Sequence, residues 1–100
     1  MLKHFRTYEL AKALYTECQA IQVRHYVKDQ LRRASLSVVL NLAEGSAKPT
    51  LKERRRFYAI SLGSLREVQA ILDLLGNSKA FTLADQVGGC LYRLVHGPKP

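Results

Sequence analysis

Residues 50–75 read TLKERRRFYAISLGSLREVQAILDLL, and this segment has the pattern of one long helix. Its apolar residues recur every three or four positions, which is the spacing that places them on one face of an α-helix. Thr50 followed by Glu53 matches a capping box, in which the threonine accepts a hydrogen bond from a first-turn N–H group. Gly76 suits the position just after the end of a helix. The segment therefore predicts a helix about 39 Å long.

Three further segments, two before this helix and one after it, show the same spacing. They cover residues 7–22, 27–44 and 82–95. Gly45 suits the left-handed position after the second of these helices. Connections of about four to six residues leave neighbouring helices antiparallel. The prediction is therefore an all-α fold: one domain over residues 1–100, built as an antiparallel up-down four-helix bundle.

The charge balance of the chain is strongly basic. Sixteen Lys and Arg against eight Asp and Glu give a formal net charge of +8. This exceeds what solubility requires of a small domain, so polyanions are the first partners to consider. Because 47% of the residues are hydrophobic, the basic charge belongs to the surface of a folded protein and not to a disordered tail.

No arrangement of residues typical of catalysis or metal binding is evident. Cys18 and Cys90 are isolated, and the three histidines lie in separate segments. Nucleotide-binding, hydrolase and metalloprotease motifs are missing. We therefore expect no enzymatic activity, no cofactor and no metal. No segment has the character of a signal peptide or a membrane span, so we expect a cytoplasmic protein that does not bind membranes.

A cluster of cations surrounds the predicted start of the helix over 50–75. Its members are Lys48, Lys52, Arg54, Arg55 and Arg56, accompanied by Glu53. The helix macrodipole favours acids at this end, so the cluster works slightly against helix stability. Phosphate would suit it, because first-turn N–H groups and arginine forks both bind phosphate oxygens. The cluster therefore predicts a nucleic-acid-binding surface.

Cations near the start of the helix over 27–44 could widen this surface. They are Arg24, Lys28 and Arg32, and Tyr26 beside them offers a ring on which a base could stack. The alternative is a solvated run of charge that keeps the protein soluble. Because no base-reading motif is evident, contacts would be made to the backbone, with slight sequence preference.

Short polar residues interrupt the apolar faces of the two central helices. We expect them to form a polar seam between these helices, and its candidate members are Arg33, Ser37, Asn41, Glu44, Ser64 and Glu67. Such residues are poor helix formers that suit close helix approach and interfacial hydrogen bonds. Arg33 could pair with Glu67 or with Glu44. The alternative is that the stripe on the helix over 27–44 faces water.

The helix over 50–75 is more apolar than one bundle requires. On a helical wheel its apolar side chains occupy an arc of roughly 240°. Four helices provide no central position in which such a helix would be covered on all sides. A second apolar surface therefore predicts self-association into a symmetric homo-oligomer.

Several blocks of the sequence together carry a family resemblance. DQLRRASLSVVLNLAEG (29–45) is followed by RFYAISLGSLRE (56–67), and FRTYELA (5–11) stands near the start. These blocks resemble the bacterial four-helix-bundle proteins encoded by intervening sequences of 23S ribosomal RNA genes. Gly88 and Gly89 depart from a regular fourth helix, since each costs about 0.8–1 kcal/mol relative to alanine, which leaves the continuity of that helix open.

The same broad family is similar to Avd, the accessory variability determinant of diversity-generating retroelements. The resemblance to that basic homopentameric barrel implies a pentamer that binds RNA and also DNA through the backbone. It also implies a reverse transcriptase as protein partner. The alternative is an intervening-sequence-encoded scaffold or protein-interaction module without nucleic-acid function. The net charge of +8 favours the first interpretation.

Overall fold

The computed structural model describes residues 5–97, which fold into four helices. The helices are α1 (Arg6–Gln19), α2 (His25–Ser46), α3 (Leu51–Leu75) and α4 (Ser78–His96). No strand occurs within the described residues. The prediction of an all-α fold with four helices is confirmed.

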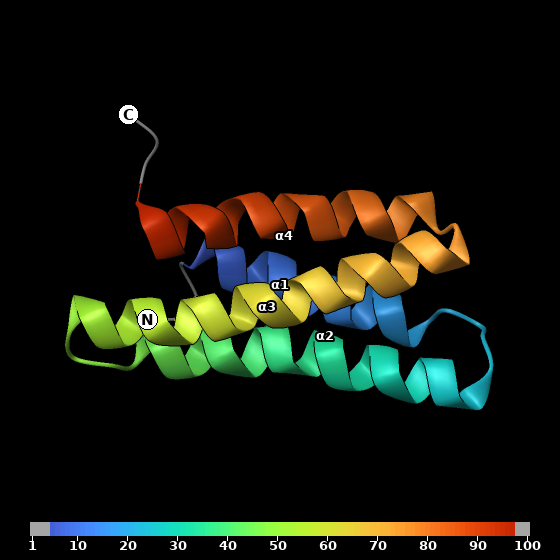
Figure 1. Cartoon of the computed structure of the whole chain (residues 1–100), viewed down its shortest axis with the longest axis horizontal. Coiled ribbons are helices and arrows are strands. Elements are labelled where there is room, and N and C mark those ends of the chain that lie inside the picture. Colours follow the sequence, from blue (N-terminus) through green and yellow to red (C-terminus); the bar gives the residue numbers. More distant parts are fainter. Residues whose placement is uncertain (1–4, 98–100) are drawn as a thin grey trace.

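Each helix packs against its neighbours in the chain, and α4 closes onto α1. Figure 1 shows the connection from α2 to α3 at one end of the bundle, and the turn from α3 to α4 at the opposite end. We call the first, with residues 47–50, the α2–α3 end. We call the second, with Gly76-Asn77 and the connection from α1 to α2, the α3–α4 end. Both ends of the described chain lie toward the α2–α3 end (Figure 1).

Leucine and valine side chains from all four helices fill the core. The largest fully buried side chains are Leu14, Leu31, Leu42, Leu65, Leu72 and Leu91. Two serine hydroxyls are buried among them without being left unpaired. Ser35 donates to the carbonyl of Leu31 within α2, and Ser61 of α3 donates to the carbonyl of Val38 in α2, both at 2.8 Å. Such bonds are needed because an unpaired buried hydroxyl would destabilise the core.

The helix boundaries differ from the predicted ones at several points. α1 ends at Gln19 and not at residue 22, and α2 extends to Ser46. α4 begins at Ser78, four residues before the predicted start, because the Asn77 side chain accepts a hydrogen bond from the Ala80 N–H at 2.9 Å. α4 also continues unbroken through both of its internal glycines.

Gly45 is not the left-handed residue after α2 that the sequence predicted. It lies inside α2, where a β-carbon would come within 2.9 Å of the Tyr58 ring and 3.0 Å of Phe57 Cβ. Gly88 has a similar place in α4, where a β-carbon would lie 3.1 Å from a methyl group of Leu65. Both glycines therefore allow a neighbouring helix to approach α3 closely, which offsets their low helix propensity.

The two cysteines are both buried, and neither forms a disulfide. Burial raises the pKa of the Cys18 thiol to about 11, and the neighbouring Glu17 carboxylate adds to the shift. Cys18 therefore stays a neutral thiol at physiological pH, with the character of a packing residue and not of a nucleophile. None of the four helices within residues 5–97 is long and apolar enough to cross a membrane.

Candidate nucleic-acid interface

The start of α3 is held by the threonine cap that the sequence predicted. Thr50 Oγ1 accepts a hydrogen bond from the Glu53 N–H at 3.1 Å and lies 3.0 Å from Glu53 Oε1. The Glu53 carboxylate therefore sits against its own cap, in the position that the helix macrodipole favours. As a result it forms no ion pair with the cations that surround it in sequence.

Two of the five cations in the cluster bind groups in or beside the connection between α2 and α3. Lys48 Nζ lies 3.0 Å from Glu44 Oε2 and 5.1 Å from the centre of the Phe57 ring. Arg54 Nη1 donates to the carbonyls of Lys48 and Pro49, at 3.0 and 3.3 Å. These bonds satisfy backbone carbonyls that follow the end of α2. Lys48 and Arg54 therefore have structural partners within the fold.

The other three cations face solvent together. Lys52, Arg55 and Arg56 are all exposed, and their spacing of three and four places them on one face of α3. Within residues 5–97 none of the three forms an ion pair. Arg56 lies 5.3 Å from the centre of the Phe57 ring, which holds its guanidinium group close to the helix surface.

The last turn of α4 brings a further cation to this end. A β-carbon at Gly97 would lie only 3.5 Å from Arg55 Nη2, which places the end of α4 beside the start of α3. Arg93 and His96 are exposed in that last turn. We define the cationic surface as Lys52, Arg55 and Arg56 of α3 together with Arg93 of α4. Sequence reasoning missed Arg93 because a basic residue near a helix C-terminus is ordinary and gave no separate signal.

The structure does not bring Arg24, Lys28 and Arg32 to the cationic surface. They lie at the start of α2, whose 22 residues span about 33 Å, whereas the clustered cations follow its end. Arg32 is also engaged, because its guanidinium group donates to Asp29 Oδ1 at 2.7 Å. This hydrogen bond lowers the pKa of Asp29, so the carboxylate stays charged at neutral pH. Tyr26, the predicted stacking ring, lies at the same distant end.

The middle of the predicted polar seam comes together between α2 and α3. The hydroxyl groups of Ser37 and Ser64 are 2.7 Å apart, and Asn41 Nδ2 donates to Ser37 Oγ at 3.1 Å. The Gln30 side chain donates to the Glu67 carboxylate, which also joins the two helices. The seam is thus a short chain of neutral hydrogen bonds with one charged acceptor toward its α3–α4 end.

Neither of the ion pairs considered for Arg33 forms. Arg33 Nε lies 3.1 Å from Asp29 Oδ2, one turn away on its own helix, while Glu44 pairs with Lys48. Partners four residues apart on one helix are already neighbours, so they meet without any contribution from helix packing. Arg33 and Glu44 consequently belong to the exposed side of α2 and not to the seam.

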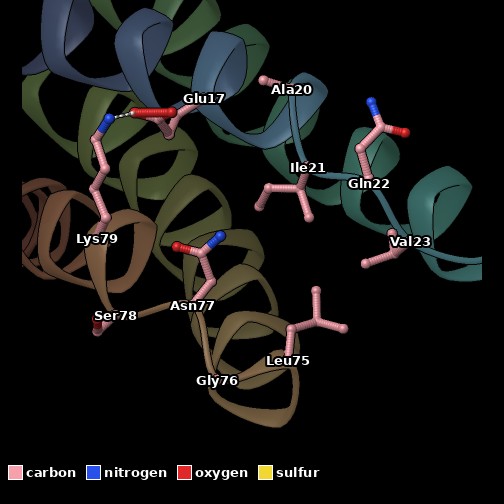
Figure 2. Close-up of a pocket in the computed structure, with 10 residues that line it drawn as sticks. All are labelled: Glu17, Ala20, Ile21, Gln22, Val23, Leu75, Gly76, Asn77, Ser78 and Lys79. Carbon is pink, nitrogen blue, oxygen red and sulfur yellow. Dashed lines mark ion pairs between the residues drawn. The ribbon is translucent and has the colours of Figure 1, made fainter.

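A hollow of about 610 Å³ lies at the α3–α4 end. Figure 2 shows Ile21 and Val23 from the connection after α1, and Leu75 from α3, around this hollow. Its charged residues, Glu17 and Lys79, pair with each other at 3.5 Å (Figure 2). The ten lining residues include no histidine, cysteine or aspartate. Within residues 5–97 no cluster of three or more His, Cys, Asp or Glu could hold a metal ion.

The protein is a small four-helix bundle with a group of exposed cations at its α2–α3 end. The chain belongs to the 23S rRNA-intervening sequence protein family, whose model matches residues 5–88. The match covers α1 to α3 and the first half of α4, and it therefore includes the α3 part of the cationic surface. No curated protein and no solved structure shows significant similarity to the chain.

Proposed function

We propose that this protein is a non-enzymatic accessory protein that binds RNA, and also DNA, through the nucleic-acid backbone. The observation that carries the proposal is the cationic surface. Lys52, Arg55 and Arg56 share one face of α3 and have no acidic partner within residues 5–97, although the fold pairs other cations with acids. Exposed cations without an acidic partner favour the binding of a polyanion. Binding releases counterions and does not require an ion pair within the protein to be broken.

The mode of action that we propose is that of Avd, with a retroelement reverse transcriptase as the protein partner in the cytoplasm. We further infer that the bundle is of the antiparallel up-down type and that it forms a homopentamer. Leu40 of α2 and Ile60 of α3 support self-association, because 56% and 42% of their surfaces remain exposed. Gly63 lies one turn from Ile60 on α3 with open space above it, so another subunit could approach the backbone closely.

Filter binding of a labelled RNA over a salt series tests the nucleic-acid function. Three phosphate contacts predict roughly a 20-fold loss of affinity for a single strand when salt rises from about 50 to about 200 mM. An affinity that does not change over this range would contradict a phosphate-dominated mode. Light scattering on the same preparation tests the oligomer, and a monomer would contradict the self-association.

The second candidate function is a scaffold or protein-interaction module without nucleic-acid binding. The exposed apolar residues on α2 and α3 favour it, since they fit a protein partner as well as a second copy of the chain. In that case the cationic surface would serve an acidic protein. Oligomers that fail to bind RNA at about 50 mM salt would support this candidate, because phosphate contacts are strongest at low salt.

A further inference from the structure

An aromatic pair lies beside the cationic surface, at the end of α4. The rings of Tyr92 and His96 are one helical turn apart, with centroids 4.3 Å from each other and planes inclined by 43°. Both residues are exposed, with 39% of the Tyr92 surface accessible. Arg93 follows Tyr92 directly, and Gly97, next to His96, lies against Arg55 of α3. Two neighbouring rings therefore adjoin cations from two helices.

We infer that the ligand of this surface is single-stranded nucleic acid and that one of its bases stacks on the Tyr92–His96 pair. The inference rests on the proposed function and narrows its substrate class. Sites for single strands combine cations that follow the backbone with aromatic rings that stack the bases, and each base–ring contact tolerates any sequence. In a duplex the base faces are covered by neighbouring pairs, so these rings would gain nothing except at a duplex end.

The contact between the two rings prepares them for this role. His96 packs against Tyr92 within α4, so the tyrosine ring is partly ordered before a base arrives and less conformational entropy is lost on binding. Arg55 lies against Gly97, the residue after His96, and Arg93 adjoins Tyr92 in sequence with its guanidinium group 3.6 Å from Cys90 Sγ, so both can reach phosphates that flank a stacked nucleotide. Gly97 has a positive φ of 81°, a backbone conformation that suits glycine, and this turn ends α4 beside the Arg55 guanidinium group.

Tyr26 provides a matched contrast at the α3–α4 end. It is more exposed than Tyr92, at 70%, and it also stands near cations, Arg24 and Lys28. Within residues 5–97, however, its ring packs against no other ring, and of the nearby cations Arg32 is bound by Asp29 whereas Arg24 and Lys28 form no ion pair. Exposure and nearby charge alone would favour Tyr26. The contact with His96 and the nearby α3 cations of the cationic surface favour Tyr92 as the residue on which a base stacks.

The test is a fluorescence anisotropy titration of a labelled single-stranded RNA, with an RNA duplex of the same length in parallel. Tyr92→Leu should lower the affinity for the single strand by about 5- to 150-fold, the range that corresponds to the loss of one stacked base. Its affinity for the duplex should change by no more than about twofold. Tyr92→Phe keeps the ring and should bind both ligands as the wild type does. Tyr26→Leu should leave single-strand binding unchanged.

Each of the other outcomes decides against the inference in a distinguishable way. If Tyr92→Leu binds the single strand as tightly as the wild type, or loses both ligands equally, the stacking role is overturned while the proposed nucleic-acid function stands. If the wild type binds neither ligand, both fail. Circular dichroism verifies that Tyr92→Leu is folded, and His96→Ala in the last turn of α4 supplies a second variant with the same expected selective loss, of about fivefold.

Discussion

The two ends of the bundle both carry cations, but they hold them differently. At the α3–α4 end, Asp29 binds Arg32 at 2.7 Å and Arg33 at 3.1 Å, and Lys79 pairs with Glu17, while Arg24 and Lys28 form no ion pair within residues 5–97. At the α2–α3 end, the one acid within the first turn of α3 is turned back onto its own threonine cap. The three cations of the cationic surface that lie on α3 consequently have no acidic partner within residues 5–97.

This difference shows that a count of charges along the chain does not locate a binding surface. Cations that already have an acidic partner must lose it before they can bind a phosphate, whereas unpaired cations only release counterions. The two neighbouring aromatic residues, Tyr92 and His96, lie at the α2–α3 end, where the α3 cations form no ion pair within residues 5–97. Nucleic acid should therefore bind at the α2–α3 end.

Reversing three positive charges at each end should give the largest difference in RNA affinity between the two ends. The triple variant K52E/R55E/R56E should lower RNA affinity by more than about 100-fold, because three attractive phosphate contacts become repulsive. The matched variant R24E/K28E/R32E changes the net charge by the same amount at the other end and should cost less than about fivefold. Filter binding at one moderate salt concentration measures both. Equal losses would show that only the net charge matters.

Glycine replacements test how the α2–α3 end is packed. Gly45→Ala should lower the free energy of unfolding by about 1–2 kcal/mol, because overpacking against Tyr58 and Phe57 outweighs the better helix propensity of alanine. Gly89→Ala in α4, where a β-carbon would come no closer than 3.9 Å to another side chain, should instead raise it by about 0.5–1 kcal/mol. Urea denaturation measures both. A change of the same sign in the two variants would contradict the close approach at Gly45.

The seam between the two ends sets the register of α2 against α3. Ser37→Ala and Ser64→Ala should each lower the free energy of unfolding by about 0.5–1.5 kcal/mol, the usual contribution of one hydrogen bond. The double variant should lose less than the sum of the two, because both single changes remove the same bond. A double-mutant cycle by urea denaturation gives this coupling. Strict additivity would mean that the two hydroxyl groups do not interact in solution.

The smallest expected effect comes from releasing the paired arginines. Asp29→Asn leaves Arg32 and Arg33 without their carboxylate and should raise RNA affinity by about two- to fivefold at low salt. The gain is modest because exposed ion pairs are weak. Anisotropy titration of wild type and variant measures it. Lower affinity in the variant would show that pairing with Asp29 does not restrain these arginines.

The sequence predicts what depends on spacing within one helix. The four helices, the Thr50 cap and the left-handed Gly76 after α3 all follow from local patterns. Ser37, Asn41 and Ser64 were also recognised, because short polar residues at helical spacing stand out on an apolar face. For the binding surface, the three exposed cations on α3 belong to one visible cluster.

The parts that sequence reasoning missed all depend on how helices lie against each other. Gly45 resembles a helix terminator until Tyr58 is seen to pack against it. Arg93 joins the cationic surface only because α4 ends beside Arg55. Arg24 is a candidate for the same surface by its charge and its place near a helix start, although α2 separates it from the cluster by about 33 Å. Helical periodicity contains no information on these distances.

The salt dependence of RNA binding in alanine variants tests the central claim most directly, because its slope counts the phosphates that the protein contacts. Relative to wild type, K52A/R55A/R56A should have a slope of log affinity against log salt that is shallower by about two to three, whereas R24A/K28A/R32A should keep the wild-type slope within about one-half. The opposite assignment, with the slope lost in the R24A/K28A/R32A variant and retained in K52A/R55A/R56A, would contradict binding at the α2–α3 end.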